Sequence, residues 1–154
     1  MDYTLEVVVV PVSDIDRAKH FYSEQMGFVV DVDHQPNDEF RVVQMTPPGS
    51  GCSVTIGKGL AAMEPGSLQG LQLCVVDIEA AHAELSARGV PVSPIQHHDG
   101  TGFVPGKGEP WNSFIFLKDP DGNGWAIQEK PAPQPSAVDA PETPRRRTRA
   151  RRTP

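Results

Sequence analysis

The chain has 154 residues, of which 38% are hydrophobic and 22% are charged, a composition typical of one globular domain. The formal charge of −6 is an average over two unlike segments. Residues 1–130 hold 8 basic and 18 acidic side chains, a charge of −10, whereas 131–154 hold six arginines and two acids, a charge of +4. We therefore expect no nucleic-acid partner for the body, and only weak attraction to phosphate through the Arg-rich tail.

The chain shows no sign of a membrane or a secretory segment. No apolar run approaches the roughly 20 residues that a membrane helix needs. The acidic start Met1-Asp-Tyr-Thr-Leu-Glu is unlike a signal peptide. Two cysteines, Cys52 and Cys74, are too few for a disulfide framework. We expect a cytoplasmic protein with no membrane partner, whose thiols are reduced and buried in strands.

The first half of the chain predicts a strand, a helix and three more strands. Residues 5–12 form a β-branched run that is typical of a buried strand. Ser13 is the expected N-cap of a helix that ends at Gly27, where a left-handed residue closes it. Further strands are expected over 28–32, 40–45 and 52–56.

The second half repeats this order. A strand over 71–76 precedes a helix that opens at Asp77 and closes at Gly89, and strands are expected over 90–94, 112–117 and 125–128. Superposing Asp14 on Asp77 aligns the two halves at an offset of 63 residues.

This internal duplication predicts an α+β fold in which two tandem βαβββ modules, about 3–62 and 68–130, form a cupped, curled mixed sheet around a cleft. The remaining residues, 131–154, begin with Pro131-Ala-Pro-Gln-Pro and contain no Phe, Trp, Tyr, Leu or Ile, so we expect a disordered Pro/Arg-rich tail.

The duplicated order and two motifs resemble a known family. The motif V-x-D-I-D-R-A-x-x-F-Y…G-F at 12–28 and Phe116-Leu-Lys-Asp-Pro-Asp-Gly-Asn are similar to those of the vicinal oxygen chelate superfamily. That superfamily includes glyoxalases, bleomycin-resistance proteins and dioxygenases. The resemblance covers about 5–129 and implies a small-molecule cleft and a homodimer, but one such scaffold carries many chemistries.

The resemblance also implies where a metal would be held. The family's ligands lie in the first and last strands of each half, and the matching positions here are Val7, Thr55, Gly70 and either Gln128 or Glu129. Because a catalytic divalent ion normally takes three His or carboxylate ligands, we expect no metal cofactor. We expect a ligand-binding protein that works without a metal.

Several side chains are candidates for contact with a ligand. Aromatic rings and amides in strands or beside a Gly-rich loop are suited to line such a cleft, although each is also a normal core or strand-end residue. The candidate ligand-binding residues are Phe40, Gln44, Gln72, Phe103, Trp111, Phe114 and Gln128.

Three residues carry the alternative hypothesis of an enzyme. His97 and His98 lie where a strand meets a loop, and Glu129 ends the last strand. Together they are candidate catalytic residues of an atypical metal-dependent lyase, isomerase or dioxygenase. Because neighbouring residues of a strand point to opposite faces, only one of the two histidines is expected to face the cleft.

Overall fold

The first half of the chain forms a four-stranded sheet, sheet A, in the computed structural model, which describes residues 1–133. Its strands lie in the order β1-β4-β3-β2, with β1 parallel to β4 and the other neighbours antiparallel. The elements of this half are β1 (Val7–Val9), α1 (Ile15–His20), the π-helical turn η1 (Phe21–Gln25), β2 (Val29–Asn37), β3 (Phe40–Thr46) and β4 (Ser53–Lys58).

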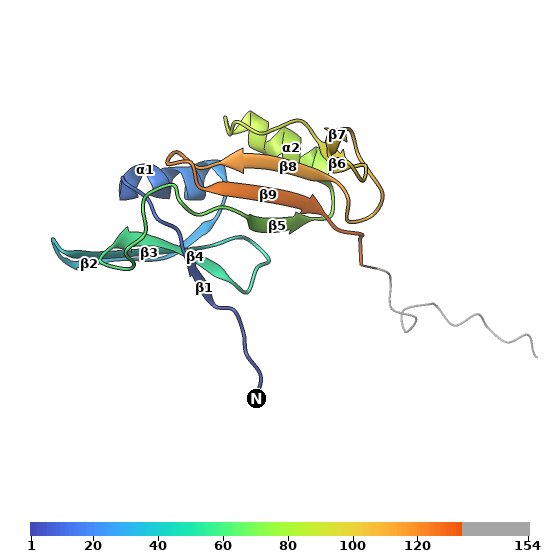
Figure 1. The fold of residues 1–154 in the computed structure, drawn as a ribbon. Helices are drawn as coiled ribbons and strands as arrows, with labels where there is room; N and C mark the ends of the chain where they lie inside the picture. Colours follow the sequence, from blue (N-terminus) through green and yellow to red (C-terminus); the bar gives the residue numbers. More distant parts are fainter. Residues whose placement is uncertain (134–154) are drawn as a thin grey trace, which may run out of the picture.

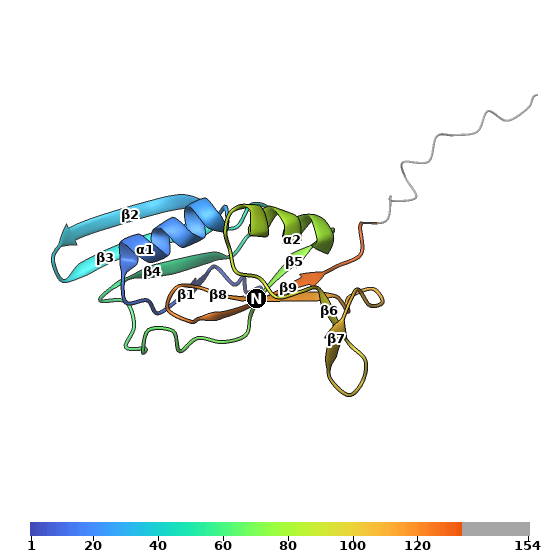
Figure 2. The same ribbon diagram turned by 90° about the horizontal axis from the view of Figure 1, so that it is seen from above.

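The second half repeats this topology in sheet B, whose order is β5-β9-β8-β6-β7 with β5 parallel to β9. Figure 1 shows the two sheets at different levels, and Figure 2 shows α1 over β3 and β4 of sheet A. The elements of this half are β5 (Leu71–Val75), α2 (Ile78–Ala87), β6 (Gln96–His98), β7 (Phe103–Pro105), β8 (Phe114–Lys118) and β9 (Gly124–Glu129). The predicted α+β fold with a repeated βαβββ order is confirmed.

Both helices begin at an aspartate and are followed by a left-handed glycine. The Asp77 side chain accepts a hydrogen bond from Ala80 N at 2.9 Å, and Gly27 and Gly89 have φ angles of 77° and 78°. The expected cap at Ser13 is wrong, because Asp14 accepts from Arg17 N at 2.9 Å. The Ser13 hydroxyl instead donates to a carboxylate of the other half, at Asp121 Oδ1.

The strand expected over 90–94 is also wrong. Only Val92 pairs there, in an isolated bridge with Leu117. Pro91 and Pro94 lack the N–H groups that a continuous ladder requires. The segment is followed instead by the short hairpin of β6 and β7, which extends the sheet by one strand.

A buried polar network joins the two halves. Tyr22 Oη donates to Asp119 Oδ2 at 2.7 Å and accepts from Trp125 Nε1 at 3.0 Å. Asn123 Nδ2 donates to Asp119 Oδ2 at 2.7 Å and to Pro11 O at 2.8 Å. Burial, followed by the neighbouring Asp119 carboxylate, raises the pKa of Tyr22 far above its usual value, so the phenol remains a donor.

One face of each sheet packs on the helices and forms the core, which includes Val43, Ile56, Ile115 and Ile127. The other face is open. Cys74 is exposed rather than buried as expected, because its place in β5 alternates onto that open face. No helix within residues 1–133 is long and apolar enough to cross a membrane. The predicted disordered tail lies almost wholly outside the described residues.

Candidate functional site

The open face of sheet B brings together five of the ten candidate residues that the sequence singled out. Strand register determines the membership, because partners in adjacent strands share a face: Gln72 pairs with Ala126, Cys74 with Gln128, and Phe114 with Gln128. We call this surface the sheet B face. Its members include Gln72, Cys74, Gln96, His98, Phe103, Pro105, Phe114, Phe116, Ala126 and Gln128.

Three phenylalanines form an aromatic wall on this face. The Phe103 ring packs edge-on against Phe114 and Phe116, with centroids 5.6 and 5.0 Å away, and Phe114 stacks on Phe116 at 6.2 Å. The His98 ring meets Phe103 edge-on at 5.3 Å. Phe103 is 48% exposed, so the wall presents ring surface that the other residues of 1–133 leave uncovered.

His98 is held in place by its neighbours. Asn112 bonds to both sides of its peptide, with Oδ1 accepting from His98 N and Nδ2 donating to His98 O, each at 2.9 Å. The Nδ1 atom of the His98 ring accepts a hydrogen bond from Gly100 N at 3.1 Å. The following loop is ordered by Asp99, whose pKa is lowered to about 2, chiefly by the backbone N–H of Thr101.

Amides supply the polar part of the face. Gln72 Nε2 donates to Gln128 Oε1, and Gln128 Nε2 donates to the Trp111 carbonyl, each at 2.6 Å. The Trp111 side chain is 53% exposed and lies beside a smaller hollow that is also lined by Lys107, Pro110 and Glu129. The structure thus places the carbonyl of Trp111 at the sheet B face.

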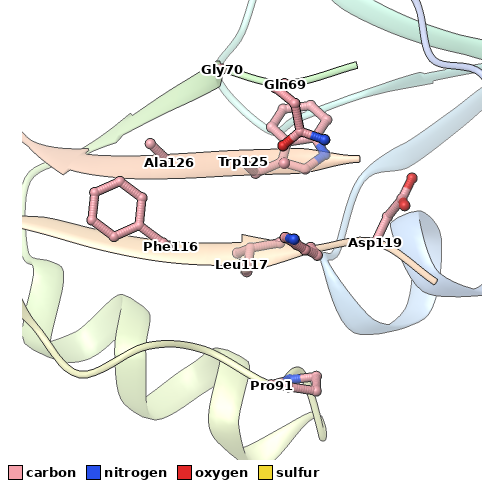
Figure 3. A pocket seen from close by; sticks show the side chains of 10 residues that line it. Gln69, Gly70, Pro91, Phe116, Leu117, Asp119, Trp125 and Ala126 are labelled. Atoms are coloured by element: carbon pink, nitrogen blue, oxygen red, sulfur yellow. The ribbon is translucent and has the colours of Figure 1, made fainter. Parts of the chain in front are cut away.

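A hollow of about 720 Å³ runs along the β8–β9 hairpin, next to the aromatic wall. Figure 3 shows Phe116 and Ala126 on neighbouring strands, with Gly70 at the start of β5 and Pro91 on the segment after α2. The volume of this hollow falls within the range of small-molecule pockets in proteins. Sequence reasoning missed Phe116, although its spacing from Phe114 predicts that the two rings share a face.

Phe40 and Gln44 lie elsewhere, on the open face of sheet A, because they alternate with the buried Val43 and Met45 of β3. Gln44 Nε2 donates to Ser53 Oγ at 3.3 Å. The Ser53 hydroxyl also contacts Thr46 Oγ1 at 2.7 Å. Within one chain, these two candidates are therefore on a different sheet from the aromatic wall.

The three candidate catalytic residues are not assembled into one site. His98 is on the sheet B face, but neighbouring His97 points to the other side, where Nδ1 lies 3.0 Å from Gly106 O. Glu129 Oε1 accepts from Ile78 N, at the start of α2, at 3.2 Å. It also accepts from Lys107 Nζ at 3.0 Å, a hydrogen bond that raises the pKa of Lys107.

The positions that correspond to the family's metal ligands do not fit a metal. Val7 and Gly70 offer no side-chain ligand, and Thr55 offers one hydroxyl. Both amide atoms of Gln128 are already hydrogen-bonded. In the part of the chain that the structure describes, no three His, Cys, Asp or Glu side chains lie close enough together to hold a metal ion.

Comparison with known proteins identifies the family. Residues 4–127 match the model of the Glyoxalase/Bleomycin resistance protein/Dioxygenase superfamily. Among solved structures, TnmS3, an antibiotic binding protein from Streptomyces sp. CB03234, is 35% identical with a TM-score of 0.67, over 84% of this chain and 97% of that one. A member of the superfamily from Sphaerobacter thermophilus is 28% identical with a TM-score of 0.66, over 84% and 98%.

A curated relative is similar over nearly its whole length. The uncharacterized protein YetH of Bacillus subtilis (strain 168) is 29% identical over 130 residues, which are 79% of this chain and 94% of YetH.

Proposed function

Because the chain belongs to the Glyoxalase/Bleomycin resistance protein/Dioxygenase superfamily, whose scaffold carries several chemistries, we propose from its site that it binds a small aromatic molecule on the sheet B face. The observation that carries the proposal is the exposed wall of Phe103, Phe114 and Phe116 beside a hollow of about 720 Å³. Aromatic side chains supply large apolar area, and neutral amides nearby fix the orientation of a ligand. The similarity to an antibiotic binding protein favours an antibiotic or an amphiphilic aromatic metabolite as the ligand.

Calorimetric titration with 2-naphthol, a minimal aromatic probe, tests this function. Phe116→Ala should weaken binding about tenfold, because one lost aromatic contact costs about 1.4 kcal/mol. The control is Met63→Ala, which shortens a 39% exposed apolar side chain in the segment that links β4 to β5. This variant should bind 2-naphthol as tightly as the wild type does. Equal affinity of the Phe116→Ala and Met63→Ala variants would contradict the proposal.

The proposed binding needs no metal, because aromatic rings and amides make the contacts. Treatment with EDTA should leave the affinity for 2-naphthol unchanged. Loss of binding after EDTA and its recovery on addition of zinc, nickel, iron or manganese would instead favour the metal-dependent reading.

The proposal includes a homodimer. Both open faces carry exposed apolar side chains, including Val29 at 57%, Val32 at 43% and Phe103 at 48%, and apolar surface of this kind marks an interface. If sheet A of one copy covers sheet B of the other, Phe40 and Gln44 reach the site after all. Light scattering during gel filtration should give about twice the chain mass of 16.7 kDa, and a monomer would contradict this part.

The cysteines bear on the location of the protein in the cell. Both cysteines of the chain are free, as is usual in the reducing cytoplasm, so we propose a cytoplasmic location. Fractionation of the cells that produce it should recover the protein with cytoplasmic markers.

A further inference from the structure

The hydrogen bonds between the two glutamines of the sheet B face run in one direction. A backbone carbonyl can only accept, so the Gln128 atom that lies 2.6 Å from Trp111 O is the donor Nε2. Gln128 Oε1 is thereby turned toward β5, where Cys74 Sγ also approaches it at 4.0 Å. The Trp111 carbonyl therefore sets the orientation of the Gln128 amide.

The orientation of Gln72 follows from that of Gln128. Because Gln128 Oε1 is an acceptor, the Gln72 atom 2.6 Å from it is the donor Nε2, and Gln72 Oε1 points away. Within residues 1–133, no donor forms a hydrogen bond with Gln72 Oε1. On the sheet B face, the small side chain of Ala126 separates Gln72 from Phe116, so Gln72 Oε1 is a free acceptor on the same side of the sheet as the aromatic wall.

Trp111, which starts this chain of bonds, has an unusual backbone. Its φ angle of 69° makes it the one non-glycine residue of the described chain in the left-handed region, where a bulky residue is disfavoured. Asn112 N, the next amide, is bonded to Glu109 O at 2.9 Å, which holds the turn. Such outliers persist where the surrounding structure enforces them, and they cluster at functional sites.

We propose that the chain Trp111 O–Gln128–Gln72 makes the site selective for aromatic ligands that carry a hydrogen-bond donor, such as a phenolic hydroxyl. Gln72 Oε1 accepts from that hydroxyl, and Trp111 and Gln128 are positioning residues that keep this oxygen free to accept a hydrogen bond from a ligand lying on the sheet B face. This inference rests on the proposed function. A ligand whose hydroxyl is capped loses the bond and leaves the amide oxygen covered without a partner, which costs affinity.

A matched pair of probes tests the selectivity. The wild type should bind 2-naphthol about tenfold more tightly than 2-methoxynaphthalene, in which a methyl group replaces the hydroxyl proton. Gln72→Leu should bring this ratio close to one while changing the affinity for 2-methoxynaphthalene less than twofold. Equal affinities in the wild type, or an undiminished ratio in the Gln72→Leu variant, would overturn the assignment of Gln72 Oε1.

Two substitutions of Trp111 test the role of its backbone. Trp111→Gly and Trp111→Val both remove the indole, but glycine adopts a φ of 69° freely and β-branched valine does not. The Trp111→Gly variant should keep the tenfold ratio between the probes, and the Trp111→Val variant should reduce it to threefold or less. The same ratio in both variants would overturn the positioning role.

The outcomes separate this inference from the proposed function. Binding of both probes with equal affinity, weakened in the Phe116→Ala variant, would keep the aromatic site and refute its selectivity. Absence of binding for both probes would refute the two together. The thermal midpoint of each variant shows that it is folded. Gln128→Met cannot donate from an amide, so it should reduce the affinity ratio between the two probes to threefold or less, as Trp111→Val does.

Discussion

Substitution of Tyr22 by Phe removes one oxygen atom from the contact between the two halves of the chain. That oxygen is the donor to Asp119 Oδ2 at 2.7 Å and the acceptor from Trp125 Nε1 at 3.0 Å. Tyr22 has no exposed surface, and Asp119 and Trp125 are 5% and 4% exposed. Water therefore cannot easily replace the lost oxygen: Trp125 Nε1 is left without a partner, and Asp119 Oδ2 keeps only the hydrogen bond from Asn123.

The expected loss of stability follows from these two bonds. A hydrogen bond to a charged group contributes about 1.5–3 kcal/mol, and a buried N–H left without a partner costs about 1–3 kcal/mol. Because the two effects share one oxygen, we expect a combined loss of about 3 kcal/mol in the free energy of unfolding. For a chain of this length, that lowers the thermal midpoint by roughly 10 °C.

Urea denaturation followed by circular dichroism measures this difference. Tyr3→Phe is the matched control, because Tyr3 is 87% exposed and its loss of a hydroxyl should change stability by less than about 0.5 kcal/mol. A loss below about 1 kcal/mol for Tyr22→Phe would refute the view that this network joins the halves.

Three further predictions concern charge, packing and the tail. Hydrogen bonds from Arg41 lower the pKa of Asp33, so the stabilisation that they give is present above the unfolded carboxyl pKa of about 3.9 and is lost as the pH falls below that value. In urea denaturation, Asp33→Asn should lower the free energy of unfolding by about 1 kcal/mol at pH 7. This difference from the wild type should narrow below about pH 4. A deficit independent of pH would contradict this. Gly57→Ala would bring its Cβ within 2.0 Å of the Arg41 carbonyl and should lower stability by about 3 kcal/mol or more, whereas Gly51→Ala has open space and should change little in the same assay. Removal of 134–154, which holds six arginines, should weaken retention on heparin at low salt, and unchanged retention would show that the tail does not attract polyanions.

The repeated order of elements was predictable because it depends on local chemistry. Aspartates before amphipathic segments and glycines after them mark helix ends, and Asp77, Gly27 and Gly89 take these roles in the structure. The predicted N-cap at Ser13 was wrong because serine and aspartate are both good caps and local sequence does not separate them. In the structure, the Ser13 hydroxyl donates to the distant residue Asp121.

The site was less predictable, because it depends on register and on long-range partners. The sequence does not show which of His97 and His98 lies on the open face of the sheet, because a shift of the strand register by one residue exchanges their faces. The same ambiguity applied to Gln128 and Glu129, and pairing with β5 and β8 places Gln128 with Gln72 on the open face. The left-handed backbone of a tryptophan has no sequence signal, so the role of the Trp111 carbonyl emerges only from the structure.

A crystal structure of the protein with 2-naphthol would show whether an aromatic ligand binds on the sheet B face. We expect the naphthalene ring on the sheet B face, against Phe116 and Phe114, with its hydroxyl within hydrogen-bond distance of Gln72 Oε1. A naphthalene ring bound away from the sheet B face, or a hydroxyl without contact to Gln72, would contradict this expectation.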